Sequence, residues 1–255
     1  MTTTARIRRP GIRSLGILVV SEAKMVLRDT AGMIVPLGLP LLVLLTSAGS
    51  AGDLVIVDGL TALDLYVLPL VIVIMIATIG VINMPSFLAY YRRAGILRRL
   101  AVTPASPFLV LAAQAIVSAI QIIAGIALAF TVAAVALGAQ APRSIAAALG
   151  VLALVIAALY GVGLMVAAIA PTPNSAVALG LVAFFALGAL GGMFGGPDSL
   201  PSALAEFGRW LPFGAAVECL TMAWAGDTIP IGQLFALLVT VCVGTATAAV
   251  LFRWE

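Results

Sequence analysis

The stretch YVLPLVIVIMIATIGVINMPSFLAY, residues 66–90, decides the fold of this chain, because it contains no charged side chain. About 20 apolar residues are enough to cross the ~30 Å hydrocarbon core of a membrane as a helix. The 255 residues as a whole are 63% hydrophobic and only 9% charged, whereas a soluble domain carries about 25% charged residues. Such a chain cannot cover its surface with polar groups in water, so we predict an integral membrane protein.

Further apolar runs on both sides of this stretch bring the number of predicted spans to six. In chain order they are Gly32–Ser50, Tyr66–Tyr90, Phe108–Leu137, Ile145–Ala170, Ser175–Phe194 and Ile231–Phe252. The third and fourth runs exceed 20 residues, so we expect these helices to tilt or to protrude. The predicted fold class is therefore an all-α, polytopic membrane protein, with residues 1–255 forming a single transmembrane domain.

The basic residues are distributed unevenly along the chain, which predicts its orientation. Six precede the first span, four lie between the second and third, and one follows the sixth, so eleven of the 13 share one side. Lys and Arg near span ends remain in the cytoplasm, so both termini are predicted to be cytoplasmic. We attribute the net charge of +3 to this topology signal and expect no nucleic-acid partner. Abundant Ala, Gly, Val and Arg beside a single lysine suggests a GC-rich bacterial genome, hence a bacterial inner membrane.

Residues 12–30 are predicted to form an interfacial helix that lies along the membrane before the chain turns into the first span. Ser14, Ser21 and Arg28 share one face of this helix, and most of its apolar residues lie toward the other. The alternatives are a simple anchor or an extension of the first span. A cleaved signal peptide is a weaker alternative, because the charged lead-in is too long.

The composition gives this chain no catalytic or nucleotide-binding machinery of its own. There is no histidine, the usual proton acceptor at neutral pH, and two isolated cysteines, Cys219 and Cys242, do not make a metal site. Met25 follows the only lysine, Lys24, whereas a phosphate-binding P-loop needs Gly-Lys followed by Ser or Thr. We therefore expect no enzyme activity, cofactor or metal in this chain and an external source of energy.

The segment YRRAGILRRLAVTPASP, residues 91–107, is a compact basic loop between the second and third spans. Its arginines and its apolar residues recur at helical spacing, and Thr103-Pro104 ends the pattern, because a residue before proline avoids helical geometry. We predict a short amphipathic cytoplasmic helix. The alternative is a basic loop that only orients the protein and binds anionic lipid headgroups.

Within this segment, AGILRRLAVTPASP resembles the loop after the second span of type-2 ATP-binding-cassette (ABC) exporter permeases. That family has a glycine, a short helix and Leu-x-x-Thr-Pro before the next span. WLPFGAAVECL, residues 210–220, is similar to the Leu-Pro element in the family's outer segment. The family often carries glutamate just before the glycine, whereas this chain has Tyr-Arg-Arg-Ala. The arginines would therefore contact acidic residues on a partner.

The resemblance implies the membrane subunit of an ABC exporter that works with a separate cytoplasmic ATPase, which would bind ATP and Mg²⁺. Two six-span subunits, identical or different, would pair. The residues implied to couple to the ATPase are Arg92, Arg93, Gly95, Leu97, Arg98, Arg99, Leu100, Thr103 and Pro104. The resemblance also implies that residues 196–230 form a re-entrant outer hairpin, which includes Leu211, Pro212 and Glu218.

The outer segment itself predicts two short helices. Ser199 is expected to cap the first, which would run through Trp210 with Glu206 and Arg209 at i, i+3 spacing. Pro212 then breaks that helix, and Phe213–Ala225 are expected to form a second helix that ends at Gly226. Half-length helices can enter a membrane only where protein buries their ends, and the alternative is a loop on the membrane surface.

Polar residues within the spans are candidates for the substrate pathway, because they are costly in lipid. They are Asn83, Gln114, Ser118 and Gln121; the alternative role is hydrogen bonding between helices. The spans show no Asp, Glu, Lys or Arg, which favours a hydrophobic or amphiphilic cargo (a drug, lipid or secondary metabolite) and external energy. An ion-coupled carrier and a non-transporting assembly subunit remain alternatives. A glycine-rich stretch, residues 188–196, predicts close helix packing, either within the chain or across a dimer.

Overall fold

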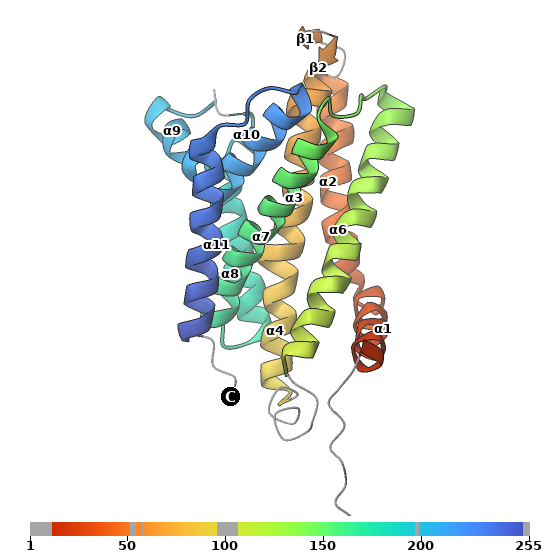
Figure 1. Ribbon diagram of the computed structural model, residues 1–255, viewed down its shortest axis with the longest axis vertical. Helices are drawn as coiled ribbons and strands as arrows, with labels where there is room; N and C mark the ends of the chain where they lie inside the picture. The colour runs from red at the N-terminus through yellow and green to blue at the C-terminus, as the bar shows by residue number, and fades with distance from the viewer. Residues whose placement is uncertain (1–11, 52–54, 58, 96–106, 197–198, 252–255) are drawn as a thin grey trace, which may run out of the picture.

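The computed structural model describes residues 12–51, 55–57, 59–95, 107–196 and 199–251. Within these residues the chain forms a bundle of long helices (Figure 1). One end of the bundle carries α1, the end of α4 and the start of α6, and the other carries β1, β2, α9 and α10 (Figure 1). The end of α11 lies at the same end as α1 (Figure 1), as an even number of spans requires.

The described elements follow one another as helices, interrupted by a single two-stranded antiparallel hairpin. In chain order they are α1 (Ile12–Arg28), α2 (Thr30–Ala51), β1 (Val55–Val57), β2 (Leu60–Thr61), the π-helical turn η1 (Leu63–Val67), α3 (Leu68–Ala77), the π-helical turn η2 (Thr78–Asn83), α4 (Met84–Arg93), α6 (Pro107–Leu137), α7 (Ile145–Ile169), α8 (Pro173–Leu190), α9 (Ser202–Trp210), α10 (Pro212–Ala225) and α11 (Ile231–Leu251).

Five described helices are long and apolar enough to span a membrane: Leu63–Arg93, Leu109–Leu137, Ile145–Ile169, Pro173–Leu190 and Ile231–Leu251. Helices α1 and α2 form a pair bent by 63° that passes the same test when counted as one span, which brings the number to six. The predicted all-α, polytopic membrane fold is therefore confirmed. Helix α8 ends four residues before the predicted end of the fifth span, where the glycine-rich stretch begins.

The second span forms the core of the bundle. The hydrophobic window in Leu63–Arg93 is 89% buried, whereas the other spans leave much of their surface exposed to the surroundings. Two π-helical turns interrupt this span, and each is followed by a helix with a proline in its first turn, Pro69 in α3 and Pro85 in α4. Proline has no N–H to continue the helical ladder, so Pro69 and Pro85 lie where the regular bonding has already changed.

Glycines allow several helices of the bundle to touch backbone to backbone. A Cβ on Gly244 of α11 would overlap the backbone of Gly161 in α7, and one on Gly163 would overlap the carbonyl of Gly80. In the glycine-rich stretch, Gly191 lies against Phe213 at the start of α10. Close packing of this stretch within the chain is therefore confirmed, and packing across a dimer stays a prediction.

The two short outer helices are present, with one correction. Helix α9 begins at Ser202 with Pro201 at its N-cap, so the predicted cap by Ser199 is wrong; that hydroxyl donates to the carbonyl of Gly196 at 2.7 Å. The cause is Pro201, which keeps the residue before it out of helical geometry and so prevents an earlier start. Helix α10 ends at Gly226, whose φ of 77° is left-handed, as predicted. A re-entrant position of this pair in the membrane stays a prediction.

Candidate functional site

The predicted coupling loop begins where α4 ends. Gly95, with φ 66°, follows the last turn of α4, and its N–H donates to the carbonyl of Arg92 at 3.1 Å. A left-handed residue after a helix is a common stop signal that glycine adopts without strain. The family-like glycine therefore ends the second span. The other predicted coupling residues, Leu97, Arg98, Arg99, Leu100, Thr103 and Pro104, lie outside the described residues.

The end of α4 is fixed to helix α1 by a buried polar contact. The hydroxyl of Tyr91 donates to the carboxylate of Glu22, and these residues are only 3% and 7% exposed. Met25 of α1 and Val110 of α6 pack around Tyr91. Glu22 lies one helical turn from Leu18 on the buried side of α1. A displacement of the base of the loop would therefore also displace α1.

The two described arginines of the loop have different surroundings. The guanidinium of Arg92 donates to the carbonyls of Ala167, at 3.4 Å, and of Ala170, at the C-terminal end of α7. Cations at this position pair with unsatisfied carbonyls and with the negative end of the helix dipole. Arg92 therefore joins α4 to α7. Arg93, in contrast, is exposed and is available to a partner.

Asn83 and Gln121 converge on one backbone carbonyl at the bend between α1 and α2. The Asn83 side-chain amide donates to the carbonyl of Gly32 at 2.7 Å, and the Gln121 amide donates to the same oxygen at 3.0 Å. Gly32 is four residues before Pro36, which has no N–H to pair with that carbonyl. Asp29 accepts the N–H of Gly32 at 3.1 Å. The amides thus replace the missing helical bond, which is their expected alternative role between helices.

A second carbonyl released by a proline is satisfied in the same way at the opposite end of the bundle. Pro69 cannot donate to the carbonyl of Leu65, and the hydroxyl of Thr221 in α10 donates to it at 2.8 Å. Both contacts obey the requirement that backbone groups inside a membrane protein find partners within the protein. Carbonyls that prolines leave unpaired in this bundle therefore accept hydrogen bonds from side chains of neighbouring helices.

Gln114 and Ser118 lie elsewhere, on the buried face of α6, and each is 3% exposed. Gln114 lines a pocket of about 310 Å³ between α4, α6 and α7, together with Tyr160. The side-chain oxygens Gln114 Oε1 and Tyr160 Oη are buried and have no hydrogen-bond partner. The four in-span polar residues therefore belong to two sites, the Gly32 carbonyl and this pocket.

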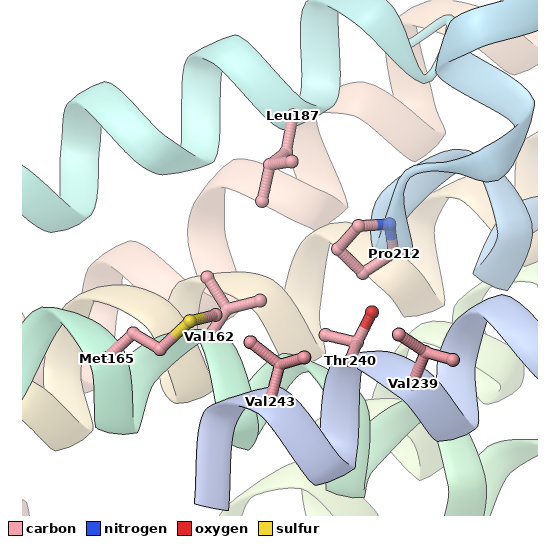
Figure 2. A pocket seen from close by; sticks show the side chains of 7 residues that line it. All are labelled: Val162, Met165, Leu187, Pro212, Val239, Thr240 and Val243. Atoms are coloured by element: carbon pink, nitrogen blue, oxygen red, sulfur yellow. The ribbon is translucent and has the colours of Figure 1, made fainter. Parts of the chain in front are cut away.

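A second pocket, of about 260 Å³, lies between α7, α8, α10 and α11 (Figure 2). Its wall is formed by Val162, Met165, Leu187, Pro212, Val239, Thr240 and Val243 (Figure 2). The Thr240 hydroxyl, its one polar group, already donates to the carbonyl of Ala236 at 2.9 Å. This pocket offers an apolar surface without an available polar anchor.

The end of the bundle that carries α9 and α10 has a small charged network. The guanidinium of Arg209 donates to both carboxylate oxygens of Glu218, at 2.6 and 3.1 Å, and Gln233 donates to the same carboxylate at 3.3 Å. The predicted pairing of Arg209 with Glu206 is also present, at 3.7 Å. Leu211 is the residue between α9 and α10, and Pro212 begins α10. The predicted hairpin residues therefore tie α9, α10 and α11 together.

Asp64 is a structural residue at the start of the second span. It lies in the first turn of the second span with no exposed surface. Its carboxylate accepts the N–H and the hydroxyl of Thr61, at 2.9 and 2.8 Å, and the N–H of Gln140 at 2.7 Å. The carboxylate thus joins the β-hairpin to the connection between α6 and α7. Its position after Thr61 at i, i+3 spacing is the sequence signal for a local cap.

A known protein family matches this chain. The family model described as ABC-2 type transporter matches residues 13–224 of the chain. No curated protein matches the chain. The family match runs from helix α1 through the loop at residues 91–107 to the end of α10, well over half of the sequence. This chain therefore belongs to the ABC-2 type transporter family.

Proposed function

We propose that this chain is the membrane subunit of an exporter, driven by a separate ATPase that docks against residues 91–107 and α1. Family membership, which makes the chain the membrane-spanning part of an ABC transporter, is the observation that carries the proposal. The contact between Tyr91 and Glu22 supports it, because a force applied to the loop would reach α1 and α4 together. ATP and Mg²⁺ would bind to the partner.

The cargo proposed is a hydrophobic or amphiphilic molecule, such as a drug, lipid or secondary metabolite. Both pockets of the described bundle have mainly apolar walls, and the charged network at the outer end is already engaged in contacts between helices. A strongly charged or sugar-like cargo would find few partners on such surfaces. We further propose outward transport, because the resemblance in the loop is to exporters.

The working assembly in this proposal contains two membrane subunits, identical or different, and two ATPase subunits. It lies in the inner membrane of a bacterium with both termini in the cytoplasm. The charge distribution supports this orientation, and α1 and the end of α11 share one end of the bundle (Figure 1). The exposed Arg93 would contact an acidic surface of the ATPase.

The proposal is tested with the complex of this chain and its ATPase in proteoliposomes. We expect ATP-dependent export of a fluorescent amphiphilic dye that does not respond to a proton or sodium gradient alone. Arg93→Glu should weaken ATPase binding about tenfold, equivalent to about 1.4 kcal/mol, and lower flux in proportion. Arg93→Lys, the matched control, should retain both. Flux driven by an ion gradient without ATP would refute the proposal.

A further inference from the structure

The pocket between α4, α6 and α7 opens on the side of the bundle. Its wall includes Met84 and Leu88 of α4, Gln114 and Ala115 of α6, and Tyr160 of α7. Ala115 is exposed, and the pocket lies in the half of the bundle that carries α1. If this side of the bundle lies against the bilayer, the opening would be accessible to lipid.

Two unpaired polar atoms distinguish this pocket. In the described part of the chain, Gln114 Oε1 and Tyr160 Oη are the buried side-chain oxygens or nitrogens that lack a hydrogen-bond partner. Ser118 lies near the Tyr160 hydroxyl but outside hydrogen-bonding geometry. An unpaired polar group is costly in an apolar environment. Both atoms belong to residues of one pocket but lie behind its apolar wall, so a side-chain rotation would let another molecule supply the missing bonds.

The pocket of Figure 2 is the internal comparison. It is of similar size, but the hydroxyl of its one polar residue, Thr240, is already bonded to the carbonyl of Ala236 within α11. That pocket leaves no polar atom unsatisfied and gives no indication of a specific ligand. The difference between the two pockets is therefore chemical and not a matter of volume.

We propose that the pocket between α4, α6 and α7 binds an apolar molecule with one hydroxyl or N–H group, at a step where cargo enters from the membrane. The donor would bond to Gln114 Oε1, which needs only rotation about the broad final torsion of that side chain. The Tyr160 hydroxyl can both donate and accept. A cavity of about 150 Å³ holds benzene, so a volume of about 310 Å³ suits a body of two fused rings. The cargo role rests on the proposed function, whereas binding does not.

Binding is tested on the full chain in nanodiscs of dioleoylphosphatidylcholine, a lipid without hydroxyl or N–H donors. The probes are 2-naphthol and 2-methoxynaphthalene, which share a ring system but differ in the donor. We expect 2-naphthol to bind about 3- to 10-fold more tightly, the value of one hydrogen bond. Gln114→Leu keeps the volume, removes an unpaired group and should abolish this preference. Ala115→Phe should block both probes, and Ala124→Phe, on an exposed face of the same helix, should block neither.

Equal affinity for the two probes, a preference that survives Gln114→Leu, or binding that survives Ala115→Phe would overturn the proposal. Competition identifies the source of the ligand. Displacement of 2-naphthol by dioleoylglycerol but not by trioleoylglycerol assigns the site to a lipid with a free hydroxyl, and displacement by neither assigns it to a small molecule; displacement by both overturns the donor requirement. These measurements need no ATPase, so their failure is separate from failure of the transport function.

Discussion

The carbonyl of Gly32 offers a direct test of how this bundle tolerates proline in a span. Asn83→Leu and Gln121→Met each remove one amide that donates to that oxygen while keeping the side-chain volume nearly constant. Pro36→Ala restores the backbone N–H that a regular helix would place there. Measuring the two amide substitutions with and without Pro36→Ala therefore asks whether the amides act through the released carbonyl.

The magnitude follows from the two bonds. A hydrogen bond between helices in a membrane contributes about 0.6 kcal/mol on average and up to ~1.7 kcal/mol. Either single substitution leaves one donor on the Gly32 carbonyl, so each should cost about 0.5–1 kcal/mol of unfolding free energy. The double substitution leaves the carbonyl unpaired, which adds a desolvation penalty, and we expect a total of about 2–3 kcal/mol. With Pro36→Ala the same pair should cost about 1 kcal/mol or less.

Unfolding by sodium dodecyl sulfate from mixed micelles, followed by tryptophan fluorescence, gives the free energy of unfolding of each variant. Pro40→Ala is the matched control, because it removes a proline from the same helix but restores the bond to the carbonyl of residue 36. The control should leave the cost of the amide substitutions unchanged. An equal cost of the double substitution in the wild-type and Pro36→Ala backgrounds would refute the reasoning, since the amides would then stabilise the protein in another way.

Three further predictions concern other contacts. Gly244→Ala should lower the unfolding free energy by about 1–3 kcal/mol, because the added Cβ overlaps the α7 backbone, whereas Gly150→Ala, with open space around it, should not destabilise the protein in the same assay. Asp64→Ala should cost about 2–3 kcal/mol, because three donors lose their acceptor, and thermal unfolding measures this loss. Burial, with a smaller effect from the neighbouring Glu218 charge, raises the pKa of the Cys219 thiol to about 12. In a Cys242→Ala variant, iodoacetamide should therefore react negligibly with the folded protein from about pH 7 to 9 and fully after unfolding. Reaction of the folded protein at the rate of an ordinary thiol would contradict this. The raised pKa contributes stability that is present below the ordinary thiol pKa and is lost as pH rises through about 12.

The long apolar runs were sufficient to predict the spans, because a helix in lipid must satisfy its own backbone and carry apolar side chains. The second span is the clearest case, and Gly226 correctly predicted the end of α10, which begins at Pro212, one residue before the predicted start. The predicted start of α9 was wrong because a local cap at Ser199 was preferred to the stronger restriction imposed by Pro201.

The sequence does not show which helices pack against one another, so it could not predict the side-chain roles that depend on this packing. Asn83 and Gln114 look alike in a pattern of hydropathy, yet Asn83 satisfies a carbonyl released by a distant proline and Gln114 has an unpaired oxygen in a pocket. The burial of Glu22 follows only from its contact with Tyr91, 69 residues later. The role of a side chain that acts between helices depends on its partner, and no local sequence pattern identifies that partner.

The second span contacts both arms of the bent pair that precedes it. Tyr91, near its end, holds α1 through Glu22, and Asn83, about two turns earlier, holds α2 through the carbonyl of Gly32. Met84, next to Asn83, forms part of the pocket wall. Because packed interiors transmit displacement with little compression, movement of the end of α4 has to shift α1, the bend and the pocket wall together. A loop attached at that end is therefore well placed to couple a separate motor to the membrane bundle.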